Sequence, residues 1–149
     1  MARRKSSRGK TAGERRKLFV LDTNTASFII RGSHPGLLQR LQSHAVTSIA
    51  ISCVTEAELL YGVARKPDAT TLTAAVSAFL QHIQAMPWDS EAAARYGTLR
   101  AQLEAAGTPL GSLDTLIAAH ALTLGATLVT HDKAFRQVPH LHLEDWMAP

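Results

Sequence analysis

The sequence predicts a single α/β domain with three layers, in which helices cover both faces of a mainly parallel sheet. Short apolar runs alternate along the chain with longer segments whose apolar residues recur at helical spacing. This alternation is typical of strands joined by helical crossovers. A chain of 149 residues, 46% of them hydrophobic, is long enough for one compact core and too short for two comfortable domains.

The elements before residue 53 follow from apolar runs and helix breakers. A continuous apolar run is typical of a buried strand, glycine and proline end helices, and β-branched residues favour strands. The expected elements are a strand at 18–21, a helix ended by Gly32 and Pro35, a helix at 36–44 with Leu37, Leu38 and Leu41 on one face, and a strand at 46–52.

The later elements rest on helical periodicity and capping residues. Asp89 or Ser90 is suited to open the longest helix, and a glycine placed after a helix C-terminus closes it. The expected helices cover residues 55–66, 71–83 with Leu72, Val76, Phe79 and Ile83 in register, 91–106 closed by Gly107, and 113–124 beginning near Ser112 and closed by Gly125. The expected strands cover 85–88, 126–130 and 140–146, the last at a sheet edge.

The composition bounds the setting of the protein. Cys53 is the only cysteine, which excludes a disulfide and a cysteine zinc site within the chain. No segment approaches the roughly 20 apolar residues of a membrane helix, and the basic N-terminus lacks a signal core. We therefore expect a reduced, cytoplasmic protein that does not enter a membrane.

The net charge of +4 is distributed unevenly. Residues 1–17 carry eight lysines and arginines against Glu14 alone, a net +7, which leaves −3 on residues 18–149. This basic segment has almost no apolar residues, so it is expected to be disordered. It could hold a phosphate backbone by charge attraction or be an inert tail, and residues 18–149 are expected to form the folded domain.

Four acids are expected at one edge of the sheet. Asp22 and Asp132 each follow an apolar strand directly, while Glu58 and Asp114 lie in the first turns of two helices. Ligands of parallel α/β sheets bind beyond the carboxyl ends of the strands. Each acid also has a simpler, structural interpretation. Asp22 and Asp114 are suited to helix N-termini, Glu58 could lie on a solvated helix face, and Asp132 could form a turn.

Carboxylates brought close together repel one another and raise one another's pKa unless a cation is present. Mg²⁺ or Mn²⁺ meets this need because both prefer oxygen ligands, and both promote phosphoryl transfer. The pattern of acids therefore favours a metal-dependent phosphodiesterase.

Four blocks of sequence resemble one known family. In order they are "VLDTN", "SCVTEAELLYG", "YGTLRAQLEAAGTPLGSLDTLIAAHAL" and "LVTHDKAFRQVPHLHLEDW", which together run from about Leu18 to Trp146. They are similar to PIN-domain nucleases, and specifically to the VapC-type toxins of type II bacterial toxin-antitoxin pairs. The ordered set is far more specific than any one block.

The resemblance implies a PIN-like nuclease domain with a metal site. By position it assigns Asp22, Glu58, Asp114 and Asp132 to the catalytic cluster that binds Mg²⁺ or Mn²⁺, with Thr23, Asn24 and Thr130 in support. It also implies an endoribonuclease that cleaves structured RNA such as tRNA or ribosomal RNA, forms a homodimer, and is inhibited by a VapB-like antitoxin. Two blocks depart from the commoner family pattern, with "GSLD" for "GPLD" or "GPFD" and "THD" for "TND" or "TNN". Ser112 is still expected to cap its helix.

Other polar residues are given structural roles. We expect His131 in a surface loop and His120 packed within a helix, because nitrogen ligands suit Zn²⁺ better than Mg²⁺. Glu144 and Asp145 are expected to be exposed and outside the cluster.

Three other functions compare with the sequence as follows. An aspartyl phosphatase needs a second aspartate two positions after the first, where this chain has Asn24, and a receiver domain needs an aspartate after the third strand, where it has Pro87 and Trp88. A catalytically idle PIN-like module that only binds RNA or a partner stays open as the alternative.

Overall fold

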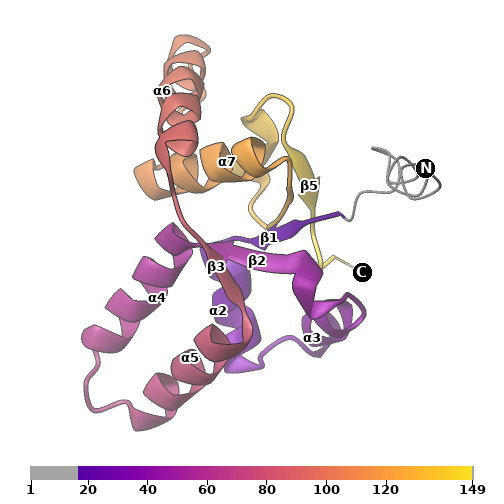
Figure 1. Cartoon of the computed structure of the whole chain (residues 1–149), viewed down its shortest axis with the longest axis vertical. Coiled ribbons are helices and arrows are strands. Elements are labelled where there is room, and N and C mark those ends of the chain that lie inside the picture. Colours follow the sequence, from indigo (N-terminus) through magenta and orange to yellow (C-terminus); the bar gives the residue numbers. More distant parts are fainter. Residues whose placement is uncertain (1–16, 149) are drawn as a thin grey trace, which may run out of the picture.

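A computed structural model describes residues 17–148, and it has the expected three-layer α/β architecture. Five parallel strands form one sheet in the order β3-β2-β1-β4-β5, with helices on both faces (Figure 1). The predicted basic tail lies outside the described residues except for Lys17. None of the helices in residues 17–148 is long and apolar enough to cross a membrane.

The chain alternates strands with one or two helices. The strands are β1 (Phe19–Leu21), β2 (Ile49–Ser52), β3 (Gln84–Met86), β4 (Thr127–Val129) and β5 (His142–Glu144). The α-helices are α2 (Thr23–Arg31), α3 (Pro35–Gln42), α4 (Cys53–Ala64), α5 (Thr70–His82), α6 (Ser90–Ala105) and α7 (Ser112–Leu124), and the short 3-10 helices are η2 (Val46–Ser48) and η3 (Lys133–Gln137).

The two faces of the sheet bury different sets of helices because side chains alternate along each strand. Val20 and Leu128 point to a core made with α6, α7 and η3. Phe19, Leu21 and Ile51 point to a second core, made with α2, α3, α4 and α5. The predicted layering is therefore confirmed.

Three local predictions were wrong. Residues 46–48 form η2 rather than the start of a strand, because β1 has only three residues and pairs with 49–51, which leaves 46–48 without a partner strand. Leu38 is 40% exposed because Leu37, one position earlier, takes the inward face of the short helix α3. Ser112 is the first residue of α7, and Gly111 is its N-cap without a side-chain hydrogen bond.

The order of the strands creates a switch point between β1 and β4. The chain steps from β1 to β2 and then to β3, and α6 and α7 carry it back across the sheet to β4 on the other side of β1. Gly125 ends α7 with a φ of 62°, a conformation that glycine adopts without strain, so the chain turns directly into β4. Open α/β sheets bind ligands at such a reversal, beyond the carboxyl ends of the strands.

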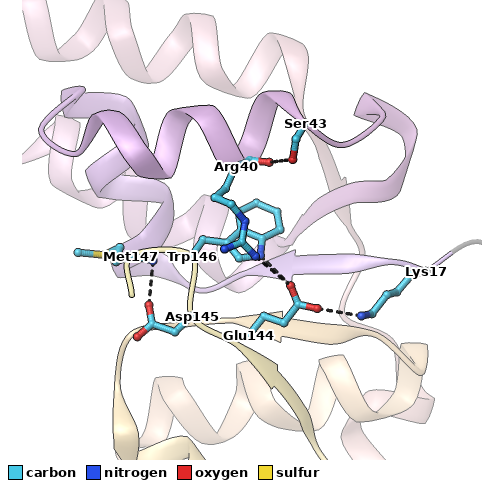
Figure 2. A network of polar contacts seen from close by, with 7 residues as sticks. All are labelled: Lys17, Arg40, Ser43, Glu144, Asp145, Trp146 and Met147. Carbon is cyan, nitrogen blue, oxygen red and sulfur yellow. Dashed lines mark hydrogen bonds and ion pairs between the residues drawn. The ribbon is translucent and has the colours of Figure 1, made fainter. Parts of the chain in front are cut away.

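The last strand is fastened by a polar network around Glu144 (Figure 2). Lys17 Nζ lies 2.8 Å from Glu144 Oε2, Trp146 Nε1 donates a 2.9 Å hydrogen bond to Glu144 Oε1, and Arg40 lies 3.6 Å from the same oxygen. Burial alone would raise the pKa of Glu144, but its bonds to Lys17 and Trp146 lower it. The network joins both ends of the described chain to α3.

Candidate active site

The four predicted acids come from four different elements beside the switch point. Asp22 follows β1 and caps α2, and Asp132 follows β4 and caps η3. Glu58 lies in the second turn of α4, and Asp114 lies in the first turn of α7. Each element begins where a strand ends or where a crossover returns to the sheet, so the fold directs all four acids to the same region.

Asp22 is a buried carboxylate with both oxygens engaged. The residue is only 4% exposed. Its Oδ1 accepts a 2.8 Å hydrogen bond from Thr25 N–H, and its Oδ2 accepts a 2.5 Å hydrogen bond from the Thr130 hydroxyl. The backbone N–H of Asp22 also donates to the carbonyl of Val129. The capping interpretation of Asp22 is therefore correct, and the cap is at the same time fixed to the end of β4.

Thr130 connects two of the acids. Its hydroxyl donates to Asp22 and accepts a 3.0 Å hydrogen bond from the backbone N–H of Asp132. Asp132 Oδ1 in turn accepts a 2.9 Å bond from Ala134 N–H. One buried hydroxyl thus sets the geometry of the loop that presents Asp132, which agrees with the supporting position expected for Thr130.

Glu58 is oriented from α2. The Thr23 hydroxyl donates a 2.6 Å hydrogen bond to Glu58 Oε1 and lies 3.0 Å from the hydroxyl of Thr55, which is completely buried. Sequence reasoning missed Thr55, although its position three residues before Glu58 puts it on the same helical face. Asn24 is exposed, and within residues 17–148 its side chain makes no hydrogen bond to the four acids.

Asp114 brings the four carboxylates into one electrostatic environment. The pKa of Asp114 is raised, first by burial and then by the negative charges of Asp132, Asp22 and Glu58, in that order. Within the described residues, no hydrogen bond to the Asp114 carboxylate offsets this repulsion. The acids are near enough to feel one another's charge, and none of the ion pairs within residues 17–148 includes any of the four.

The donor set suits a hard cation. It consists of carboxylate oxygens, which Mg²⁺ and Mn²⁺ prefer, and it includes no nitrogen or sulfur ligand. In residues 17–148, however, no three histidine, cysteine, aspartate or glutamate side chains are gathered tightly enough to hold a metal as they stand. The four carboxylates of this structure are therefore less tightly gathered than the single coordination sphere that a shared metal ion requires.

The neighbouring histidines have other partners. His131 is exposed, and its Nδ1 lies 2.7 Å from Asp145 Oδ2. His120 is buried, its Nδ1 lies 2.8 Å from the Ser52 hydroxyl that caps α4, and burial lowers its pKa. Both predicted roles are confirmed. Glu144 and Asp145 are half-buried rather than exposed, because they form the ion pairs that hold the C-terminal segment.

Comparison with known proteins shows which family the chain is similar to. The family model of the PIN domain matches residues 19–141 of this chain. The chain is 33% identical to the tRNA(fMet)-specific endonuclease VapC of Salmonella typhimurium, with 86% of this chain and 97% of that protein covered. It is 34% identical to ribonuclease VapC2 of Rickettsia felis, with 87% and 98% covered.

A solved structure agrees with these matches. The crystal structure of DNA-bound VapBC from Salmonella typhimurium includes a chain that superposes with a TM-score of 0.82 and 33% sequence identity, covering 87% of this chain and 98% of that one. The likeness therefore extends over nearly all of the described domain.

Proposed function

Because this chain belongs to the PIN-domain family, we propose that it is a Mg²⁺- or Mn²⁺-dependent endoribonuclease, the toxin of a toxin-antitoxin pair. One arrangement carries the proposal: the Thr130 hydroxyl joins Asp22 to the loop of Asp132, and Thr23, next to Asp22, holds Glu58 at the switch point of the sheet. Burial and the charges of these three acids together raise the pKa of Asp114. A protein does not maintain such repulsion for stability, and a site that recruits a cation explains it.

Hydrogen bonds within this domain hold two of the four acids in place before any substrate binds. Thr25 N–H and Thr130 hold Asp22, and Thr23 holds Glu58. Asp114 has neither restraint within the described residues, so it is the acid most free to adjust to a ligand. The residues proposed to hold the cation are Asp22, Glu58, Asp114 and Asp132.

The reaction that fits this donor set is attack of water on the phosphorus of an RNA phosphodiester. When bound, the cation supplies charge that offsets the repulsion among the carboxylates, polarises water and stabilises negative charge on the phosphate oxygens. The new bond joins the water oxygen to phosphorus, the bond from phosphorus to the ribose 3′ oxygen breaks, and that oxygen takes up a proton. The acids fix the direction of attack, in line with the leaving oxygen.

The names of the relatives guide the choice of substrate and partner. The Salmonella relative is named for cleavage of tRNA(fMet), and the similar solved structure is a VapBC complex. We therefore extend the proposal to structured RNA, with tRNA as the first substrate to test, to a VapB-like antitoxin as partner, and to the cytoplasm as the place of action.

The test is cleavage of a whole-cell RNA pool by the purified protein. We expect discrete fragments with Mg²⁺ or Mn²⁺, no cleavage in EDTA, and recovery when the metal is added back in excess. Asp22→Asn should abolish cleavage and leave the fold intact, because asparagine also caps helices and keeps an oxygen for Thr25 N–H. Cleavage that survives EDTA contradicts the proposal.

One observation favours a second candidate. The absence of a preformed metal-holding group in residues 17–148 is what an idle binding module would also present. In that case RNA or the antitoxin would bind, yet no RNA in the pool would be cut. The same cleavage assay therefore separates the two functions.

A further inference from the structure

A groove of about 450 Å³ opens directly beside the acids. It lies between α2, α4 and α5, which pack against one another on one side of the molecule (Figure 1). Thr23 and Glu58 line the groove near the acids, and its wall also includes Arg31, Arg65 and Lys66. One groove therefore joins part of the candidate active site to three basic residues.

The two helices fix how far the basic residues lie from the acids. Both α2 and α4 begin at the carboxyl edge of the sheet and run away from it. At about 1.5 Å per residue, Arg31 is about 12 Å along α2 from Thr23, and Arg65 is about 10 Å along α4 from Glu58. The charged groups lie closer to the acids than these backbone positions, because Arg31 reaches back to the Ser27 hydroxyl and Arg65 to the ring of Tyr61.

The three basic residues carry charges without acidic partners. Within residues 17–148, none of them is within ion-pair distance of a carboxylate, whereas Arg100 pairs with Glu104. The Arg31 guanidinium donates a 2.8 Å hydrogen bond to the Ser27 hydroxyl, and the Arg65 guanidinium lies over the exposed ring of Tyr61. The side chains of Arg31 and Arg65 are therefore oriented by neutral neighbours, and their positive charge is available to a ligand.

We propose that this groove binds the phosphate backbone of the RNA strand on one side of the cleaved bond, an inference that rests on the proposed function. The four acids alone repel a polyanion. The three cations in the wall of the groove restore attraction beside Glu58, and arginine and lysine both bind phosphate. An acidic peptide would meet the same charges, but the strand that must pass Glu58 is the RNA.

The test measures RNA binding in the background of Asp22→Asn, so that cleavage does not interfere. The probe is a short single-stranded oligoribonucleotide labelled with fluorescein, followed by anisotropy over a series of salt concentrations. Arg65→Gln with Lys66→Gln should weaken binding several-fold and reduce the slope of log affinity against log salt by roughly 0.7 for each lost phosphate contact. Arg65→Lys keeps the charge and should retain most of the affinity.

A matched control removes two cations elsewhere. Arg95 lines a separate hollow between α6 and α7, Arg136 is exposed on η3, and neither pairs with a carboxylate in the described part of the chain. Arg95→Gln with Arg136→Gln changes the net charge equally and should leave binding nearly unchanged. Equal loss in both double variants, or no loss in the groove variant, overturns the proposal.

An opposite change of charge sharpens the test. Asp68 lines the hollow that adjoins the groove at Arg31. Removing its negative charge in Asp68→Asn should strengthen binding of the same oligoribonucleotide, and weaker binding would contradict the groove. The two proposals can fail separately. If the wild-type protein cuts RNA and the groove variants bind the oligoribonucleotide normally, the proposed role of the groove is wrong and the nuclease function stands. If the wild-type protein cuts no RNA but the groove variants still bind less tightly, the nuclease function is wrong and the role of the groove stands.

Discussion

At the scale of single residues, Asp114 is the most informative side chain. A helix N-terminus favours the charged form of a carboxylate, yet the pKa of Asp114 is raised. The causes are burial and then the negative charges of Asp132, Asp22 and Glu58. The sequence indicated that these acids would meet, because each follows a strand or opens a helix. It did not indicate Thr55, because the contact with Thr23 depends on how α2 and α4 pack.

Asp114→Asn should stabilise the metal-free protein at neutral pH. Because the folded pKa of Asp114 is raised, protonation stabilises the fold fully below the ordinary value of 3.8, and this stabilisation is lost as the pH rises through the folded pKa. The melting temperature of Asp114→Asn in EDTA should therefore exceed that of wild type at pH 7, and the difference should disappear near pH 3.

Adding Mg²⁺ should reverse the order of the two proteins. A ligand that binds only the folded state stabilises it, and the variant lacks one proposed ligand. If Asp114→Asn melts below wild type in EDTA at pH 7, the carboxylates do not repel one another as described.

At the scale of elements, strands and helices differed in how well the sequence predicted them. The helices were predicted closely, because periodicity and the capping residues Asp89 and Gly125 are local signals. The strand expected over residues 46–52 was too long, because its length depends on β1 as its partner. Exposure of Leu38 and of Glu144 likewise depends on neighbouring elements, which local patterns do not reveal.

The segment after β5 gives a test of packing at this scale. Trp146 is 2% exposed. The centre of its ring lies 5.3 Å from that of Phe19, and it stacks on the ring of His44 with the centres 4.9 Å apart. Figure 2 shows its hydrogen bond to Glu144. Trp146→Ala should lower the free energy of unfolding by about 3–5 kcal/mol in urea titrations.

Two variants control for this change. Trp146→Phe retains an aromatic ring and loses the bond from Nε1 to Glu144, so it should cost less than Trp146→Ala. Val46→Ala removes a side chain that is 72% exposed and should change stability by less than about 0.5 kcal/mol. A small loss for Trp146→Ala would mean that the C-terminal segment does not anchor the fold.

At the scale of the whole molecule, we propose that two copies of this chain form the dimer expected from the sequence. The chain has a mass of 16.1 kDa and a net charge of +4, which is too small to prevent association of two copies. Leu60 and Tyr61 on α4 are 50% and 65% exposed, and they offer apolar surface for a partner. Light scattering at micromolar concentration should give about twice the mass of one chain, and the mass of a single chain would contradict the expected dimer.

The central claim is that four carboxylates direct water, rather than the ribose 2′-hydroxyl, to the phosphorus of RNA. Water attack leaves a 5′-phosphate and a 3′-hydroxyl, whereas attack by the 2′-hydroxyl leaves a 2′,3′-cyclic phosphate. The most direct measurement is the chemistry of the ends produced when the purified protein cleaves tRNA with Mg²⁺, with Asp22→Asn and Asp114→Asn as controls. We expect 5′-phosphate ends from wild type and no fragments from either variant. Cyclic phosphate ends, or cleavage by either variant at the rate of wild type, would contradict the account.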